Sequence, residues 1–251
     1  MRTLRVYLAG TVMLERDDVL VTEERLPGPQ GRVAFAMLAA ERAPVSKDVI
    51  ADELWSGEPP TSWEVALRAV MSKLRAAIAH VGLDGELVHA FGCYQLKLPP
   101  DAWVDVEVAA HAVHRAETAL GKDDLEEAMG WSLAANAIAR RGFLPGADGA
   151  WVTQRRAELQ DVHVRALECR GRTQLARQEH AAASRDAERV IALEPFRESG
   201  YRLLMSAHAA AGNRADALRA FERCRTTLAN ELGTTPSSDT EALFLDILRS
   251  G

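Results

Sequence analysis

Residues 61–78 read TSWEVALRAVMSKLRAAI, and this stretch decides the fold that the sequence predicts. Its apolar side chains recur every three or four residues, which is the period of an amphipathic helix. They are Trp63, Leu67, Val70, Met71, Leu74 and Ile78. Thr61 followed by Glu64 has the form of a capping box, in which Thr61 caps the helix and Glu64 reaches back. We therefore expect a long helix from 61 to about 81 with one buried face.

The elements around this helix follow a definite order. Alternating apolar residues upstream predict short strands over 4–8, 11–14 and 19–21. A helical period follows the turn at 27–29, and Ser46 is a good N-cap for a second, shorter helix. Downstream, 87–98 has the pattern of a hairpin. Small sheet, two helices, loop, long helix and hairpin together predict a winged helix-turn-helix.

From about Val104 onward the sequence is almost wholly helical. One set of residues is spaced as in a tetratricopeptide repeat of 34 residues, namely Tyr201, Leu204, Gly212, Ala217 and Phe221. An earlier copy has Gln178 in the glycine position, and a third helix pair is expected over 105–140. The predicted fold is mainly α with a small antiparallel β part. The winged helix-turn-helix is expected over 1–100, and an all-α tetratricopeptide-like domain over 101–251.

Composition and charge restrict the function. The formal net charge is −6, which opposes nucleic-acid binding unless a local basic surface exists, with the acids concentrated in the helical domain. No apolar run approaches the ~20 residues of a membrane span, and we identify no signal peptide. We therefore expect a cytoplasmic protein with no membrane partner. Three widely spaced cysteines indicate free, buried thiols rather than disulfides or a metal knuckle.

In a helix-turn-helix, the second helix lies in the major groove, where base edges can be distinguished. Here that helix is 61–81, and Arg68, Ser72 and Arg75 project from its polar face with Lys73 beside them. The hairpin would be the wing, and it brings His89, Gln95 or Lys97 near the adjacent DNA backbone. The alternative is a solvated helix face, which is what most such charges form.

Several segments resemble the Streptomyces antibiotic regulatory protein family. They include Val45-Ser46-Lys47-Asp48-Val49-Ile50-Ala51-Asp52-Glu53-Leu54-Trp55, Met71-Ser72-Lys73-Leu74-Arg75, Gly92-Cys93-Tyr94, and Phe143-Leu144-Pro145-Gly146 followed by Trp151. Glu231-Leu232-Gly233-Thr234-Thr235-Pro236 extends the similarity toward the C-terminus. Such proteins join an OmpR-type winged helix to a bacterial transcriptional activation domain of tetratricopeptide-like helices.

The resemblance implies a function and a set of contacts. It implies an activator that binds promoter direct repeats as double-stranded DNA and associates with itself on tandem half-sites. Such an activator recruits RNA polymerase holoenzyme, and the implied target is a biosynthetic gene cluster. The expected DNA-binding residues are Ser62, Glu64, Val65, Arg68, Ser72, Lys73, Arg75, His89, Gln95 and Lys97. The expected polymerase-contact loop is Trp55, Ser56, Gly57, Glu58, Pro59 and Pro60.

Other chemistry is set aside. The segment 121–123 lacks the residues of a phosphate loop, and His111 and His114 are more simply a solvated helix face than a metal site. We therefore expect no catalysis, no cofactor and no metal. Two alternatives to an activator stay open, namely a repressor that uses the same winged helix and a tetratricopeptide-type protein-interaction scaffold.

Overall fold

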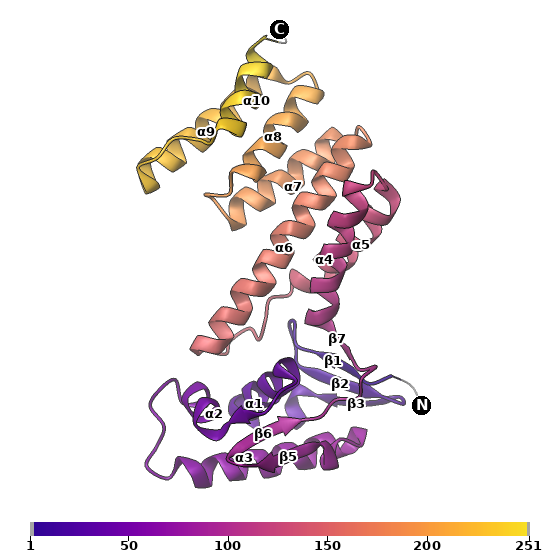
Figure 1. Ribbon diagram of the computed structural model, residues 1–251, viewed down its shortest axis with the longest axis vertical. Helices are drawn as coiled ribbons and strands as arrows, with labels where there is room; N and C mark the ends of the chain where they lie inside the picture. The colour runs from indigo at the N-terminus through magenta and orange to yellow at the C-terminus, as the bar shows by residue number, and fades with distance from the viewer. Residues whose placement is uncertain (1–2, 250–251) are drawn as a thin grey trace. The chain divides into compact units, whose positions relative to one another are not determined.

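The computed structural model describes residues 3–249, and the chain divides into two compact units. Unit 1 is Met1–Ala109 with Ile138–Gln160, and unit 2 is Ala110–Ala137 with Asp161–Gly251. The mainly α fold with a small antiparallel β part is confirmed (Figure 1). The division into units does not coincide with the predicted domain boundary at residue 100, because two segments beyond it belong to unit 1.

A four-stranded sheet begins unit 1. Its strands are β1 (Arg5–Tyr7), β2 (Met13–Arg16), β3 (Val19–Thr22) and β7 (Trp103–Val104), in the order β3-β2-β1-β7. The first three are antiparallel neighbours, as expected, and Asp17 and Asp18 between β2 and β3 both have positive φ, 50° and 66°. β7 was not predicted and runs parallel to β1. A strand of two residues is too short to show the alternation on which a strand prediction depends.

The helix-turn-helix and its hairpin follow. The elements are η1 (Glu23–Arg25), α1 (Gly28–Glu41), β4 (Val45–Ser46), α2 (Lys47–Leu54), α3 (Trp63–Ile78), η2 (Ala79–Val81), η3 (Asp84–Glu86), β5 (Leu87–Ala90) and β6 (Cys93–Leu96). Ser46 caps α2 as predicted, since its hydroxyl accepts from the Val49 N–H at 3.2 Å. β6 pairs with both β5 and β4, so the hairpin is joined to the start of α2.

The apolar stripe of α3 is buried as predicted except at its start, where Trp63 is half-buried. Leu67, Met71 and Leu74 are each 1% exposed, and they face a core to which α1 contributes fully buried side chains such as Phe35 and Leu38. Burying a leucine or phenylalanine side chain contributes ~1.5–3 kcal/mol relative to leaving it in water. This packing fixes the rotation of α3 about its axis and thereby decides which of its residues face solvent.

Asp105 connects the first residues of α4 (Asp105–Gly121) to the sheet. Its carboxylate is fully buried and accepts from the N–H groups of Leu8 and Ala9, at 2.9 and 3.0 Å. Burial raises the pKa of this carboxyl, and the backbone donors oppose the shift. Ala9 also forms a bridge with Phe143. Residues far beyond position 100 therefore complete the core of unit 1.

Glu53 fixes the start of α6 (Ala150–Ala176) on α2. It is 7% exposed, and its two carboxylate oxygens accept from the N–H groups of Trp151 and Val152, each at 3.0 Å. A carboxylate at a helix N-terminus satisfies donors that have no partner within the helix. Gly149 makes room for it, because a Cβ there would lie 2.0 Å from the carboxylate. No pattern in the sequence predicts this contact.

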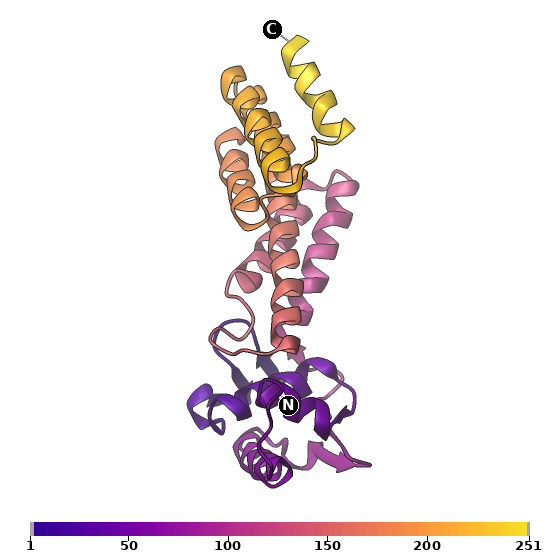
Figure 2. The same ribbon diagram turned by 90° about the vertical axis from the view of Figure 1, so that its left-hand side faces the viewer.

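Unit 2 contains the helical repeats. Its remaining helices are α5 (Leu125–Ala139), α7 (His180–Leu193), α8 (Glu198–Ala210), α9 (Arg214–Leu232) and α10 (Ser238–Arg249). Helices α7, α8 and α9 lie side by side in both views (Figure 1 and Figure 2). The predicted repeat is confirmed, since Tyr201, Leu204, Ala217 and Phe221 are buried between α8 and α9 and their neighbours. Gln178, at the glycine position of the earlier copy, has φ 61° where Gly212 has φ 77°.

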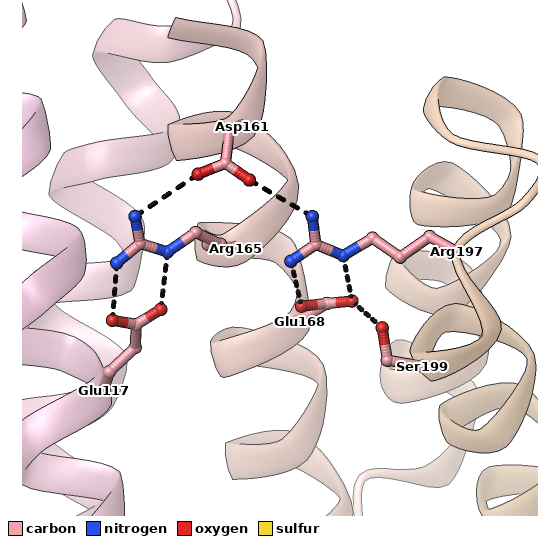
Figure 3. A network of polar contacts seen from close by, with 6 residues as sticks. All are labelled: Glu117, Asp161, Arg165, Glu168, Arg197 and Ser199. Carbon is pink, nitrogen blue, oxygen red and sulfur yellow. Dashed lines mark hydrogen bonds and ion pairs between the residues drawn. The ribbon is translucent and has the colours of Figure 1, made fainter. Parts of the chain in front are cut away.

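A network of charged side chains links the helices of unit 2 (Figure 3). Arg165 forms a fork with Glu117 at 2.7 and 2.7 Å, and Arg197 forms a second fork with Glu168 at 2.9 and 3.1 Å. Asp161 accepts from both arginines, at 3.3 and 3.2 Å. Bidentate pairs of this kind fix geometry as well as charge. The network therefore joins α4, α6 and the segment that precedes α8.

Over residues 3–249, no helix is long and apolar enough to cross a membrane. In the same range, the histidine, cysteine and acidic side chains form no group of three or more that could hold a metal ion. The three cysteines are free, as expected. Cys169 and Cys224 are buried, which raises the pKa of each thiol to about 11, whereas Cys93 is only half-buried.

Candidate nucleic-acid interface

The candidate site is the surface of unit 1 that α3 and the β5–β6 hairpin share. Helix α3 begins at Trp63, two residues later than predicted, and ends at Ile78, where η2 follows. The predicted capping box is wrong. Ser62 is the N-cap residue and makes no side-chain bond, while Glu64 pairs with Lys47 instead. The Trp63 N–H donates to the Pro60 carbonyl, and the Val65 and Ala66 N–H groups donate to the Ser62 carbonyl.

The outward face of α3 carries small and basic residues. Its exposed members are Glu64, Val65, Arg68, Ala69, Ser72, Lys73 and Ala76. Of the expected contact residues, Ser62, just before the helix, is exposed as well. Ala69 and Ala76 were not among the expected residues, because an alanine in a helix carries no signal of polarity. Small side chains matter here since they let a helix backbone approach another surface closely.

Two expected contact residues are engaged within unit 1. Arg75 is half-buried, and its guanidinium donates to the Leu87 carbonyl at the start of the hairpin, at 2.8 Å. Gln95 is also half-buried, and its amide donates to the Arg42 carbonyl at 3.2 Å. Both side chains therefore stabilise the position of the hairpin. A DNA contact by either residue remains a prediction.

The hairpin presents a different set of side chains. His89 and Lys97 are exposed, and the His89 ring lies 4.4 Å from that of Tyr94. The turn is made by Phe91 and Gly92, with φ 52° and 75°, and Phe91 is fully exposed. A positive φ is unusual for a residue other than glycine, asparagine or aspartate. Because the turn consists of Phe91 and Gly92, the tip of the hairpin is apolar and carries no basic side chain for a phosphate contact.

The positive charge of this surface comes from one short stretch of the sequence. Residues 1–100 contain 11 lysines and arginines against 13 aspartates and glutamates, and residues 101–251 contain 19 against 23. The acids are thus not concentrated in the helical domain, so this condition for DNA binding is not met. However, the chain has no acid between Glu64 and Asp84, while Arg68, Lys73 and Arg75 lie in that interval. The basic surface that the net charge requires is restricted to α3.

The segment Trp55–Pro60 between α2 and α3 is a bonded turn followed by an extended part. The Gly57 N–H donates to the Asp52 carbonyl at 2.7 Å, and the Glu58 N–H donates to the Trp55 carbonyl at 3.0 Å. Ser56 and Gly57 have φ 52° and 82°. Trp55 and Pro59 are half-buried, whereas Ser56, Gly57, Glu58 and Pro60 are exposed. The turn therefore presents the Glu58 side chain to solvent from a backbone with defined geometry.

Comparison with known proteins identifies a family model and relatives that match this chain. The model of the bacterial transcriptional activator domain matches residues 104–248. The chain is 29% identical to regulatory protein AfsR of Streptomyces coelicolor, over 98% of this chain and 24% of AfsR. It is 27% identical to regulatory protein DnrI of Streptomyces peucetius, over 98% of this chain and 93% of DnrI.

A solved structure is similar over the whole chain. It is Mycobacterium tuberculosis EmbR in complex with a low affinity phosphopeptide, with a TM-score of 0.88 and 26% sequence identity. The similarity covers 100% of this chain and 66% of that one. The transcriptional regulatory protein EmbR itself is 29% identical over 88% of this chain and 58% of its own length. This chain thus spans about a quarter of AfsR and little more than half of EmbR.

Proposed function

The chain belongs to the Streptomyces antibiotic regulatory protein family of transcriptional regulators, and we propose that it activates transcription by binding promoter DNA through α3. The observation that carries the proposal is the outward face of α3. It combines exposed Arg68 and Lys73 with small side chains, and it lies beside a hairpin without acids. A helix of this kind can enter the major groove, where arginine contacts guanine or phosphate.

The detailed proposal concerns how copies of the protein are arranged on DNA and how they contact RNA polymerase. Two copies bind tandem direct repeats upstream of a promoter, and the segment Trp55–Pro60 contacts RNA polymerase holoenzyme. The expected contact residues on DNA are Ser62, the exposed face of α3 and Arg75, together with His89, Gln95 and Lys97. Support for activation comes from the matched domain, which takes its name from transcriptional activators. The similarity to regulatory proteins of Streptomyces, together with the family resemblance, favours a biosynthetic gene cluster as the target.

The test begins with the full chain and fragments of the genome that encodes it. Bound fragments are sequenced, protected positions are mapped by footprinting, and purified holoenzyme transcribes the selected promoters with and without the protein. We expect direct repeats in the protected region, a salt-dependent affinity and more transcript. Less transcript would instead establish a repressor. Failure to enrich any fragment would leave the scaffold function and contradict DNA binding.

A further inference from the structure

Glu64 is the one acidic residue of α3, and it lies in the first turn of that helix. Its side chain is 52% exposed, on the same side of α3 as Arg68, which follows one turn later. A carboxylate on a surface that meets phosphates is repelled by them, so it lowers the affinity for every DNA sequence. Its presence therefore requires a compensating interaction.

Lys47 holds this carboxylate in place. Its ammonium pairs with Glu64 Oε1 and lies 5.5 Å from the centre of the Trp63 ring. The backbone of Lys47 is itself fixed, because its N–H donates to the Gly92 carbonyl of the hairpin at 2.9 Å. The bond to Lys47 lowers the pKa of Glu64, so the carboxylate is ionised at neutral pH and can only accept hydrogen bonds.

The second carboxylate oxygen is available to a ligand. Lys47 donates its hydrogen bond to Oε1, and a carboxylate has a second oxygen that can accept a further bond. A pocket of about 150 Å³ adjoins it, lined in part by Arg68, His89 and Tyr94. The site therefore presents one oriented acceptor beside a basic side chain, at the end of the helix whose residues contact base edges in helix-turn-helix proteins.

A purely structural role explains the pair poorly. Exposed ion pairs contribute little to folding, because water and salt screen them and two side chains lose freedom. The helices α2 and α3 are already held by buried apolar side chains, among them Ile50 and Leu67. An acid that only joined the two helices would lower DNA affinity and add little stability.

We propose that Glu64 determines base specificity by accepting a hydrogen bond from the N4 amino group of a cytosine in the major groove. Lys47 acts as the positioning residue. The inference rests on the proposed DNA-binding function. Cytosine is the base that suits a carboxylate, since it offers a donor there without an adjacent acceptor. Adenine places N7 beside its amino group, and guanine and thymine present acceptors, all of which repel a carboxylate.

The geometry of α3 also limits where this cytosine lies. Arg68 follows Glu64 by four residues, a rise of about 6 Å along the helix axis. Base pairs are spaced at about 3.4 Å, so the base read by Glu64 and the base or phosphate contacted by Arg68 are separated by no more than about two steps. Within a half-site, we therefore expect the cytosine at a fixed, short distance from the base pair at which substitution of Arg68 changes binding.

The experiment uses the full chain and the half-site selected by genomic binding. Affinity is measured with all four base pairs at each position, for the wild type, Glu64→Gln and Glu64→Ala. We expect the wild type to prefer cytosine at one position by roughly tenfold or more. Glu64→Ala should lose that preference and keep the others, and Glu64→Gln, whose amide oxygen can still accept, should weaken it. Glu24→Gln, the same charge change at an exposed residue of η1, should keep all of them.

Replacing the critical cytosine by 2-pyrimidinone, which lacks the N4 amino group, tests whether that group donates to Glu64. Wild-type affinity should fall, whereas that of Glu64→Ala should change only by the effect of the analogue on the duplex. Lys47→Met should weaken the cytosine preference without changing the melting temperature, and Lys47→Arg should restore it. A merely structural pair would show no rescue in base preference.

The outcomes separate this inference from the proposed function. If Glu64→Ala keeps the cytosine preference while binding stays sequence-specific, the role of Glu64 is overturned and DNA binding stands. If the wild type binds no sequence in preference to others, the proposed function fails, and the base assignment fails with it.

Discussion

At the scale of the residue, Arg68 and Arg75 differ in exposure and in hydrogen-bond partner, although the sequence pattern predicts the same role for both. Arg68 is exposed, and its guanidinium donates to the Glu64 carbonyl one turn earlier, at 3.3 Å. Arg75 instead donates to the Leu87 carbonyl and is half-buried. Helical spacing places both on one polar face, but it cannot show that a hairpin carbonyl lies within reach of one of them. The two substitutions should therefore have different effects.

Arg68→Ala should weaken specific DNA binding by ~1–3 kcal/mol if the side chain reads a base. If it contacts a phosphate, the dependence of log affinity on log salt should become shallower by about one unit. The melting temperature should change little, since the side chain is exposed and its hydrogen bond is to the backbone of its own helix. Mobility shifts at several salt concentrations with parallel thermal melts check this. Unchanged affinity at every salt concentration would remove Arg68 from the interface.

Arg75→Ala should destabilise the fold as well as reduce DNA affinity. The variant loses a charged donor to a partly buried carbonyl, which costs on the order of 1 kcal/mol. Denaturant unfolding of the wild type and the variant measures this loss, with Lys73→Ala as the matched control on the exposed face. If Arg75→Ala unfolds at the wild-type midpoint, the bond to Leu87 does not support the hairpin.

At the scale of the element, the sequence predicts the order of helices and strands but not the contacts that close unit 1. Periodicity identified α3, the hairpin and the α8–α9 repeat because each buries a regular stripe of apolar residues. β7, Asp105 and Glu53 left no such signal. Each acts through backbone or carboxylate contacts with a segment far away in the chain. The capping box failed for a related reason, since a neighbouring element supplied Lys47 as a stronger partner for Glu64.

The Glu53 cap of α6 should be important for the stability of unit 1. Glu53→Ala leaves two N–H groups without their acceptor, and each buried unsatisfied group costs ~1–3 kcal/mol. Gly149→Ala should also destabilise, because its Cβ would meet the carboxylate and its φ of 143° disfavours a side chain. Urea unfolding tests both, with exposed Asp52→Ala as the control on α2. Near-wild-type stability of both variants would mean that the first turn of α6 is not held by this contact.

The turn at Trp55–Pro60 should act after DNA is bound. Glu58 is exposed and makes only a backbone bond, so Glu58→Ala should leave folding and DNA affinity unchanged. Transcription in vitro with purified holoenzyme should fall if the turn contacts polymerase. Glu24→Ala, an exposed acid on η1, serves as the control. Equal transcript from wild type and Glu58→Ala would reduce this segment to a connector.

At the scale of the whole molecule, the winged helix and the repeat domain share structural elements. Unit 1 takes in the start of α4 and the start of α6, both of which lie within the match to the activator domain. Asp105, Phe143 and Glu53 contribute the contacts involved. The surface that we propose for DNA is therefore built on a core to which both parts of the sequence contribute.

A single surface of this size cannot provide the specificity that a genome requires. One winged helix contacts few base pairs, and each specific pair contributes ~1–3 kcal/mol against the many competing sites of a genome. We therefore expect two copies on tandem half-sites. Copies that bind one face of the duplex need half-site centres separated by about one helical turn, ~10–10.5 base pairs.

Inserting five base pairs between the half-sites should abolish joint binding, because it rotates one site by about half a turn relative to the other. An insertion of ten base pairs restores the rotation and should recover part of it. Footprinting and titration with the full chain measure occupancy of each half-site on the three DNAs. The Arg68→Ala variant distinguishes loss of DNA contact from loss of cooperativity, since it should weaken all three DNAs alike. If both half-sites fill equally well with the five-base-pair insertion, the copies bind independently and the tandem arrangement is wrong.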